Sequence, residues 1–315
     1  MRKKILVQQG AFLPKLEARL AAAYDVRHLP APGPERDRFL SENPTQGIEA
    51  IATSARFGVD AKTMQALPDL KVISSFGVGL DTLDLDEAKA RGIQVGYTPD
   101  VLNDCVADTA FALLMDVSRR ITEADRFVRA GQWKQAQFSA ATKVSGKRLG
   151  ILGLGRIGSA IAKRASGFDM EVHYHNRKPV EGSPYTYAAS LKELAEWADY
   201  LVVASAGGAG TKGLVSAEII DALGPDGYLV NISRGTVIDE AALIDALENK
   251  RIAGAGLDVF EREPHVPAAL LALDNVVLAP HIASNTHETR AAMAQRVEDN
   301  LAAFFAGKPL ISAAT

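Results

Sequence analysis

The chain has 315 residues, of which 47% are apolar and 23% are charged. This composition is typical of a folded globular protein with about two domains, and it excludes a disordered or collagen-like chain. The single cysteine, Cys105, rules out an intrachain disulfide and a cysteine-rich zinc site, so no metal site is predicted. With a net charge of -3, no overall basic field would attract nucleic acid or anionic lipid.

The N-terminus carries no recognisable targeting segment. Three basic residues precede only a short apolar run, Ile5–Val7, which is too short for the core of a signal peptide. No apolar run approaches the roughly 18 residues needed to cross a membrane. We therefore expect a cytoplasmic protein that binds neither membranes nor nucleic acid.

The first hundred residues alternate short β-branched runs with helical patterns, which predicts βαβ units and a mostly parallel sheet. The predicted strands are Ile5–Val7, Ala50–Thr53 and Val72–Ser75, and the predicted helices are Leu16–Tyr24 and Asp84–Arg91. The segment Pro30–Pro44 is rich in proline and charge, so we expect a surface loop there.

The same alternation restarts after residue 145 and continues for about 135 residues. Six strands are predicted, at Lys147–Leu152, Glu171–His175, Tyr200–Ala204, Tyr228–Ile232, Ala255–Val259 and Val276–Ala279. Helices are predicted between most of them, at Ser159–Gly167, Ser190–Trp197, Ala217–Leu223 and Glu240–Asn249. Six strands with interleaved helices amount to a whole doubly wound domain.

Two long helical patterns, Val101–Arg120 and Thr286–Phe305, flank this block. Only about ten residues follow the second, too few for a domain of their own, so the chain is expected to return to the first domain. The predicted fold is α/β, with two Rossmann-like or flavodoxin-like parallel-sheet domains, one inserted into the other and the active site in the cleft. Residues 1–100 and 286–315 form a discontinuous substrate-binding domain, and residues 101–285 form a dinucleotide-binding Rossmann domain.

A glycine pattern follows the first strand of the second block. Gly153, Gly155 and Gly158 match G-x-G-x-x-G between a predicted strand and a predicted helix. In that context the first glycine permits a tight turn, the second lets the backbone approach a pyrophosphate, and the third lets helix and strand pack closely. The free N–H groups at the start of the helix would then bind the phosphates. The pattern predicts dinucleotide binding.

The end of the next strand bears on the choice of cofactor. A site that prefers NAD usually has an acidic residue there for the ribose 2′-hydroxyl. This chain has Asn176, Arg177 and Lys178 instead. The two cations suit a 2′-phosphate, which predicts a preference for NADP(H), with NAD(H) possible. The alternative is that both cations belong to an ordinary solvated loop.

Three reactive side chains follow strands of the second block. Arg234, Glu263 and His281 come after three different predicted strands, so they are expected at one edge of one sheet. An arginine can bind a carboxylate and polarise the adjacent carbonyl. A histidine can donate a proton to the carbonyl oxygen, and a carboxylate beside it favours its charged form. Each residue alone is more often structural, but together they suit hydride transfer to a 2-keto acid.

With these motifs the chain resembles the D-isomer-specific 2-hydroxyacid dehydrogenases, and within them the glyoxylate/hydroxypyruvate and hydroxyphenylpyruvate reductase branch. The resemblance covers nearly the whole chain. It rests on segments that occur in the family's order, which are Ser75–Asp81, Val101–Thr109, Gly153–Gly158, Asn231–Thr236, Gly256–Pro264 and Pro280–His281.

The resemblance implies roles for matching positions. Arg234 would bind the keto acid, His281 would be the acid/base and Glu263 its partner, while the backbone N–H groups of Val78 and Gly79 would hold the substrate carboxylate. Ser54 and Arg56 follow a predicted strand and are candidates for the same cleft, or for an ordinary loop. The implied cofactor-binding residues are Thr109, Gly153, Leu154, Gly155, Arg156, Ile157, Gly158, Asn176, Arg177, Lys178, Ser205, Ile232, Ser233 and Asp258.

The chain also departs from its relatives. Similar reductases often have Thr-Pro before the two glycines of the adenine-side loop, where this chain reads Ala204, Ser205, Ala206, Gly207 and Gly208. Without the proline the loop is less restrained, and Ser205 is able to reach a phosphate or ribose. Some relatives place a neighbouring subunit's tryptophan over the substrate. Whether Trp133 or Phe138 takes that place stays open, and with it the size of the substrate.

The predicted function is an NADPH-preferring reduction of small 2-keto acids, glyoxylate and hydroxypyruvate, to D-2-hydroxy acids, with His281 as proton donor. One alternative is a dehydrogenase for a bulkier acid, such as an aryl pyruvate or 2-ketogluconate. A more remote one is a nucleotide-sensing protein without catalytic activity. The extra helix and loop predicted between Arg119 and Lys147 suit a dimer arm, so a homodimer is expected.

Overall fold

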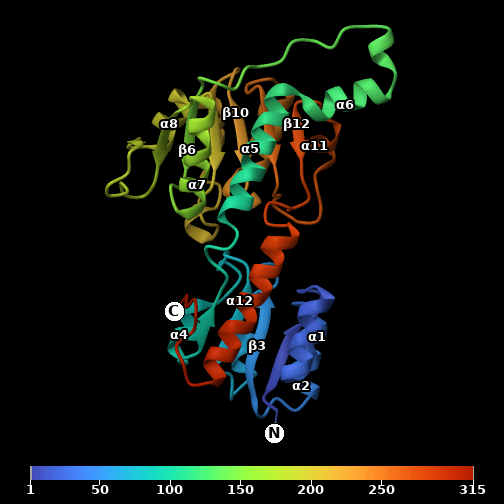
Figure 1. Ribbon diagram of the computed structural model, residues 1–315, viewed down its shortest axis with the longest axis vertical. Helices are drawn as coiled ribbons and strands as arrows, with labels where there is room; N and C mark the ends of the chain where they lie inside the picture. The colour runs from blue at the N-terminus through green and yellow to red at the C-terminus, as the bar shows by residue number, and fades with distance from the viewer. Residues whose placement is uncertain (1, 315) are drawn as a thin grey trace. The chain divides into compact units, whose positions relative to one another are not determined.

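The computed structural model describes residues 2–314 and divides the chain into two compact units (Figure 1). The chain up to Leu102 and the chain from Thr286 onward together form the first unit. Asn103–Asn285 form the second unit, which therefore interrupts the first in the sequence. Each unit has its own sheet, and each is described by itself below.

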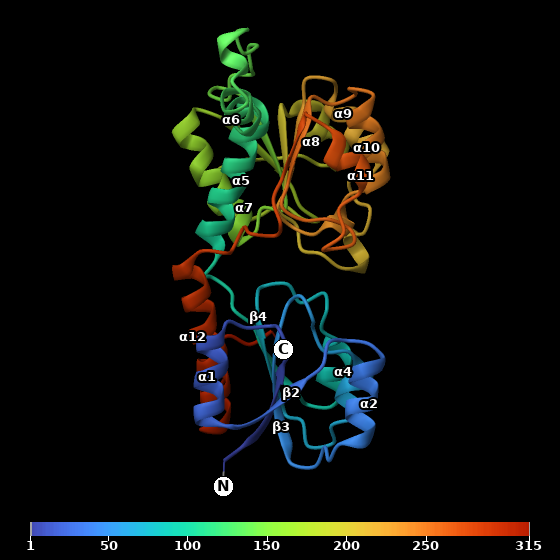
Figure 2. The same ribbon diagram turned by 90° about the vertical axis from the view of Figure 1, so that its right-hand side faces the viewer.

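The first unit is built on a five-stranded parallel sheet in the order β2-β1-β3-β4-β5. Its strands are β1 (Lys4–Gln8), β2 (Asp25–Leu29), β3 (Ile48–Ser54), β4 (Val72–Phe76) and β5 (Gln94–Gly96). Its helices are α1 (Pro14–Ala23), α2 (Pro34–Glu42), α3 (Ala61–Gln65), α4 (Leu85–Ala90) and α12 (His287–Phe305). Helices α1 and α12 cover one face of the sheet, and α2 and α4 cover the other (Figure 2). This is the flavodoxin-like order, whose switch point lies between β1 and β3.

The expectation of a loop over Pro30–Pro44 is wrong, because α2 lies within that segment. Pro34 stands at the first helical position, where its fixed φ angle suits a helix and its missing N–H group leaves no bond unmade. Glu35 and Asp37 in the first turn are favourable at the positive end of the helix dipole. The prolines and charges that suggested a loop are therefore a helix-start signal, and Leu40 anchors the helix in the core.

The second unit has a seven-stranded parallel sheet in the order β12-β11-β10-β9-β6-β7-β8. Its strands are β6 (Arg148–Leu152), β7 (Glu171–His175), β8 (Thr186–Tyr187), β9 (Tyr200–Val203), β10 (Tyr228–Asn231), β11 (Gly254–Leu257) and β12 (Val276–Leu278). Its α-helices are α5 (Asn103–Arg119), α6 (Ile121–Arg129), α7 (Arg156–Ala165), α8 (Leu191–Trp197), α9 (Ala217–Leu223), α10 (Glu240–Glu248) and α11 (Ala268–Ala272). Short 3-10 turns are η1 (Gln132–Lys134), η2 (Ser166–Phe168), η3 (Ala209–Thr211) and η4 (Gly235–Val237).

Helices cover both faces of this sheet, with α5 and α7 on one side and α8, α9, α10 and α11 on the other (Figure 2). The predicted parallel α/β fold with two sheets is confirmed. The prediction of six strands missed β8, a two-residue edge strand that pairs with β7. Such a short strand is too brief to show the alternation by which strands are recognised.

Glycines in β11 let α5 lie close to the sheet. A Cβ atom on Gly254 would come within 2.9 Å of the Val117 side chain, and one on Gly256 within 2.9 Å of Leu113. Both contacts are too short for real side chains, so glycine is required where the helix crosses the strand. This packing fixes α5 beside the strands that carry the candidate active site.

After α5, helix α6 and the residues up to β6 run along the outer edge of the second unit (Figure 1). None of the α6 residues is buried, and Ile121, Val128 and Trp133 are exposed. Within residues 2–314, no helix is both long enough and apolar enough to cross a membrane.

Candidate active site

The loops that carry the candidate catalytic residues and the glycine fingerprint leave the carboxyl ends of strands of the second sheet. The chain reverses its direction of winding between β6 and β9, which are neighbours in the sheet. In open α/β sheets a ligand binds beyond the carboxyl ends of the strands at such a switch point. The glycine loop follows β6, and the loop with Ser205 follows β9.

The three glycines of the fingerprint have three different reasons to be glycine. Gly153 has a φ of +99°, and a Cβ atom there would lie 2.6 Å from the Ser205 nitrogen. A Cβ atom on Gly158 would lie 2.1 Å from the Gly153 carbonyl oxygen, so this glycine lets α7 pack on β6. Gly155 is exposed and has nothing within 4 Å of its Cβ position. The protein itself therefore does not require glycine at 155, but a phosphate approaching the backbone would.

Gly155 is also the N-cap of α7, and no side chain caps this end of the ten-residue helix. The structure therefore has what a pyrophosphate needs, namely open backbone at Gly155 in front of an uncapped helix N-terminus. Arg156 is exposed beside it, whereas Leu154 is buried and Ile157 is half-buried. The residues present fit a dinucleotide cofactor.

Asn176 holds the glycine loop in place. Its Oδ1 accepts a hydrogen bond from the Leu154 N–H at 2.7 Å, and the carbonyl of His175 accepts one from Gly153 at 3.0 Å. The Asn176 side chain, which is predicted to contact the ribose, therefore also positions the glycine loop. Arg177 and Lys178 are exposed, and neither forms an ion pair with any residue between 2 and 314.

Ser205 and Gly207 shape the loop after β9. The Ser205 hydroxyl oxygen is buried with no hydrogen-bond partner among the described residues, and such a group is normally paired. The Ser205 carbonyl accepts a bond from the Ser233 hydroxyl. A Cβ atom on Gly207 would lie 2.4 Å from Cγ of Arg234, so this glycine makes room for the arginine. The loop that lacks the family's proline is therefore tied to the loop after β10.

The loop after β10 is held by Asn231, whose side chain is almost fully buried. Its Oδ1 accepts from the Ser233 N–H at 3.0 Å, and its Nδ2 donates to the Arg234 carbonyl at 3.0 Å. Ile232 and Ser233 are buried, whereas Arg234 is half-buried and its Nη1 donates to the Ser233 carbonyl at 2.9 Å. Asn231 therefore fixes the backbone from which Arg234 projects.

His281 and Glu263 form a hydrogen-bonded pair. His281 Nδ1 lies 2.8 Å from Glu263 Oε2, and since a carboxylate only accepts, Nδ1 is the donor. The His281 side chain is 46% exposed and that of Glu263 is 27% exposed. Burial acts to raise the pKa of Glu263, but the bond and charge of His281, the Phe260 N–H and the charge of Arg234 outweigh it and lower the pKa. The carboxylate is thus held charged, and His281 Nε2 is the ring nitrogen left to exchange a proton.

Asp258 holds the loop that carries His281. The carboxylate is fully buried, and its two oxygens accept from the N–H groups of Ile282 and Ala283 at 2.7 and 2.9 Å. The Asp258 carbonyl accepts from the His281 N–H at 2.8 Å. Burial raises the pKa of Asp258 against the opposing effect of these two N–H groups and of His281. His281 has a φ of +54°, a rarely populated conformation that these bonds stabilise.

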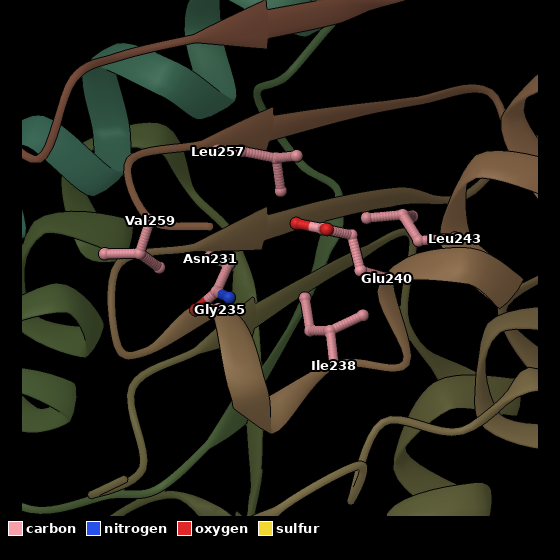
Figure 3. Close-up of a pocket in the computed structure, with 7 residues that line it drawn as sticks. All are labelled: Asn231, Gly235, Ile238, Glu240, Leu243, Leu257 and Val259. Carbon is pink, nitrogen blue, oxygen red and sulfur yellow. The ribbon is translucent and has the colours of Figure 1, made fainter. Parts of the chain in front are cut away.

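A small cavity of about 10 Å³ lies behind these loops, enough for about one water molecule (Figure 3). Asn231, Gly235 and Glu240 line it with four apolar side chains. Glu240 Oε1 accepts from the Glu261 N–H at 3.1 Å, and its carboxylate points toward the strands that carry Asn231 and Leu257 (Figure 3). Helix α10 therefore supports the loop on which Glu263 lies.

Thr109 lies on α5 and links that helix to the loop after β12. Its hydroxyl is 3.2 Å from the Cys105 carbonyl and 3.4 Å from the Ala283 carbonyl. Its neighbour Ala283 is one of the residues that Asp258 binds. The structure thus brings Thr109 to the loop that carries His281.

In the first unit, the candidate substrate residues follow β3 and β4, at the carboxyl edge of that sheet. Ser54 is the last residue of β3 and is buried. Gly77 has a φ of +136°, and its N–H donates to Thr98 Oγ1 at 2.9 Å. Val78 and Gly79 follow it and are half-buried. The bond between Gly77 and Thr98 holds the backbone of this loop in one conformation.

Sequence reasoning missed several residues that position the site. Asn231, Gly207, Gly235 and Glu240 are not among the predicted site residues. Asn231 holds the loop that follows its own strand, and the other three contact loops more distant in the sequence. A Cβ atom on Gly235, for example, would lie 1.9 Å from the Phe260 carbonyl carbon. Asn231 gave one usable signal, because an amide at the end of a buried strand needs hydrogen-bond partners in the following loop.

Comparison with known proteins places this site in a family. Residues 111–283 match the model of the D-isomer specific 2-hydroxyacid dehydrogenase NAD binding domain, and they lie within the second unit. Hydroxyphenylpyruvate reductase of Plectranthus scutellarioides is 50% identical over 85% of both chains. Glyoxylate/hydroxypyruvate reductase A of Arabidopsis thaliana is 48% identical over 89% of both. 2-Ketogluconate reductase of Gluconobacter oxydans is 49% identical over 86% of this chain and 87% of its own.

Among solved structures, the chain is similar to the NADPH-dependent glyoxylate/hydroxypyruvate reductase of Sinorhizobium meliloti in complex with NADP and malonate. The TM-score is 0.93 at 41% identity, and the match covers 100% of this chain and 97% of the other. The chain belongs to the D-isomer-specific 2-hydroxyacid dehydrogenase family. The predicted family and enzyme class, an NAD(P)-dependent D-2-hydroxyacid dehydrogenase of the glyoxylate/hydroxypyruvate reductase type, are confirmed.

Proposed function

We propose that this protein reduces glyoxylate and hydroxypyruvate to the corresponding hydroxy acids, with a preference for NADPH and with His281 as proton donor. The observation that carries the proposal is the 2.8 Å bond between His281 Nδ1 and Glu263, in loops that leave the same sheet edge as the glycine loop. Curated relatives of nearly equal length are named as reductases of these acids, which supports the choice of substrate.

The cofactor would be held by the glycine loop at Gly153–Gly158, the N-terminus of α7 and the segment Asn176–Lys178. Gly155 leaves open space for the pyrophosphate, and the unpaired Ser205 hydroxyl is available to a ribose or phosphate oxygen. Ile232, Ser233, Asp258 and Thr109 would border the nicotinamide. When bound, the cofactor supplies the hydride that reduces the carbonyl carbon.

The residues of the chain supply the rest of the chemistry. Arg234 binds the keto acid through charge-assisted hydrogen bonds and polarises its carbonyl group. His281 donates the proton from Nε2 to the carbonyl oxygen, which avoids a free alkoxide. Glu263 orients the imidazole through Nδ1 and stabilises its protonated form. Asp258 holds the backbone of the His281 loop, so the imidazole ring is positioned before the substrate binds.

The proposal assigns substrate binding to the first unit and cofactor binding to the second. Val78 and Gly79 would offer their backbone N–H groups to the substrate carboxylate, and Ser54 would contribute a hydroxyl. A glycine-containing loop suits this task because its donors are not obstructed by side chains. Replacing Gly79 by proline removes one donor, and we expect KM for glyoxylate to rise with the affinity for NADPH unchanged.

The preference for NADPH rests on Arg177 and Lys178, which are exposed at the end of β7 and have no carboxylate partner in the described chain. We expect Arg177→Gln to lower the ratio of kcat/KM for NADPH to that for NADH by about tenfold, the effect of one charge-assisted bond. Arg262→Gln removes an exposed cation from a different loop and serves as control. An unchanged ratio in Arg177→Gln would show that these cations do not select the cofactor.

A second candidate is the reduction of a bulkier 2-keto acid. It is favoured by the near-equal identity to relatives named as reductases of hydroxyphenylpyruvate and of 2-ketogluconate. Initial rates on glyoxylate, hydroxypyruvate, phenylpyruvate and 2-ketogluconate, each with NADPH and with NADH, separate the two candidates. The proposal requires the highest kcat/KM for the two small acids with NADPH. No turnover of any acid would support a nucleotide-binding protein without catalytic activity.

The proposal also includes a homodimer. Helix α6 has no buried residue although its apolar residues lie on one side, and Trp133 just beyond it is 69% exposed. Amphipathic helices ordinarily bury their apolar side, so a second copy of the chain is the proposed cover. Sedimentation equilibrium of the wild type and of a Val128→Asp variant would test this. We expect a dimer that dissociates in the variant, whereas a monomeric wild type would contradict it.

A further inference from the structure

The first unit contains an arginine that the site described above does not use. Arg290 lies in the second turn of α12. The centre of its guanidinium lies 4.8 Å from the centre of the Phe76 ring. The Phe12 ring, 5.9 Å away, packs edge-on against the same Phe76. Phe76 is the last residue of β4 and leads directly into Gly77, Val78 and Gly79. The cation therefore lies at the base of the proposed carboxylate loop.

Arg290 lacks the partners that a half-buried cation usually has. Its Nε is buried without a hydrogen-bond acceptor, and no carboxylate pairs with it anywhere in residues 2–314. Its backbone N–H donates to the Thr286 carbonyl, and its guanidinium lies over the Phe76 ring. Burial lowers the pKa of the Arg290 guanidinium, with no negative charge nearby to offset the effect. Most buried arginines are paired.

A half-buried guanidinium without a counter-charge weakens the free protein, because burial penalises its charge. Features that cost stability without a structural return concentrate at sites that bind a ligand. An anionic ligand would supply the partner that Arg290 lacks among the described residues.

We propose that Arg290 binds the carboxylate of the 2-keto acid together with the backbone N–H groups of Val78 and Gly79. The assignment rests on the proposed function and adds to it a specificity residue for the acid group. The flat ring of Phe76 holds the guanidinium on one side and leaves its outer nitrogens as donors, and a guanidinium matches the geometry of a carboxylate. A neutral aldehyde or ketone would gain nothing from this contact.

The test is the effect of Arg290→Gln on KM for glyoxylate and for hydroxypyruvate, with NADPH saturating. Both acids share the carboxylate, so we expect KM to rise by roughly 10- to 100-fold for both, as for the loss of a charge-assisted bond. We expect little change in kcat, because the carboxylate is bound alike in the ground state and the transition state. Arg290→Lys keeps the charge and should recover part of the affinity.

Arg296→Gln is the matched control, since it removes a half-buried arginine two turns further along the same helix. Its KM values should equal those of the wild type. The thermal midpoint and the affinity for NADPH, measured on all variants, report whether the fold is kept. If Arg290→Gln does not fold, the KM of Arg290→Lys decides whether Arg290 binds the carboxylate: a KM above that of the wild type for both acids supports the assignment, and an unchanged KM overturns it.

Unchanged KM values for both acids in a folded Arg290 variant would overturn the assignment. A rise confined to hydroxypyruvate would also overturn it, since Arg290 would then bind the substituent at C3 rather than the carboxylate. These outcomes are distinct from failure of the proposed function, in which the wild-type protein itself would reduce neither acid.

Discussion

The carboxyl edges of the two sheets are equipped very differently. In the second unit, the reactive side chains are fixed by buried polar residues, with Asp258 beneath His281 and Asn231 beneath Arg234. In the first unit, the loop after β4 offers backbone N–H groups beyond Gly77, and Arg290 lies on Phe76 with no hydrogen-bond acceptor for its Nε among residues 2–314. Under the proposed function, the second unit would supply proton transfer and carbonyl polarisation, and the first unit would serve mainly to hold the acid.

Removal of the Arg234 guanidinium should have the largest effect of the substitutions at the two sheet edges. We expect Arg234→Gln to lower kcat/KM for glyoxylate by about 10²- to 10³-fold, since the lost bonds are to a charged group and strengthen as the carbonyl gains charge. Steady-state rates measure this, and Arg262→Gln serves as control because it removes an exposed cation from a neighbouring loop. If Arg234→Gln and Arg262→Gln lowered kcat/KM equally, the loss would come from the change in net charge and not from a contact of Arg234 with the substrate.

Substitution of Asp258 tests whether the His281 loop, at the carboxyl edge of the second unit's sheet, depends on the buried Asp258 carboxylate. Asp258→Ala leaves the Ile282 and Ala283 N–H groups without an acceptor, and we expect a loss of about 2–4 kcal/mol in the free energy of unfolding together with a lower kcat. Asp258→Asn keeps one acceptor oxygen, so its free energy of unfolding should lie between those of the wild type and of Asp258→Ala. Urea unfolding followed by circular dichroism measures the first effect. Wild-type stability in Asp258→Ala would mean that these bonds do not hold the loop.

Glu263 acts on His281 rather than on the substrate. We expect Glu263→Gln to lower kcat about tenfold, since the imidazole loses the charged acceptor that orients its ring through Nδ1. Glu261→Gln changes an exposed carboxylate of the same loop and is the control. A kcat equal to that of the wild type would assign Glu263 a packing role alone.

The smallest expected effect concerns stability in acid. The pKa of Glu263 is lower in the folded protein than in the unfolded chain, so its contribution is fully present above the unfolded value of about 4.3. It is lost as the pH falls through the folded value. The difference in unfolding free energy between the wild type and Glu263→Gln should therefore shrink between about pH 5 and pH 3. A difference that grows in acid would contradict the cause given for this shift.

Much of this architecture follows from local sequence. The alternation of β-branched runs and helical patterns predicts the two parallel sheets, and the glycine fingerprint and three reactive residues after three strands predict the dehydrogenase site. Helix α2 was misread because proline has opposite meanings at the start and in the middle of a helix. Strand β8 was not predicted because two residues are too few to show the alternation of apolar and polar side chains by which a strand is recognised.

The positioning residues could not be predicted in the same way. Gly207 makes room for Arg234, and Asp258 binds the backbone of residues 282 and 283, across distances of about 25 residues along the chain. Arg290 lies over Phe76, more than 200 residues away in sequence. Such contacts follow from the order of strands in the sheets, which no local pattern records.

In the proposed mechanism, His281 donates the proton and Glu263 orients its ring. The most direct test is the single-turnover rate of NADPH oxidation by glyoxylate in His281→Ala, with NADPH affinity measured in parallel. We expect a rate lower by about 10²- to 10⁴-fold, the usual contribution of a general acid, and an unchanged affinity for NADPH. A His281→Ala enzyme that keeps the wild-type rate would show that the proton comes from another group.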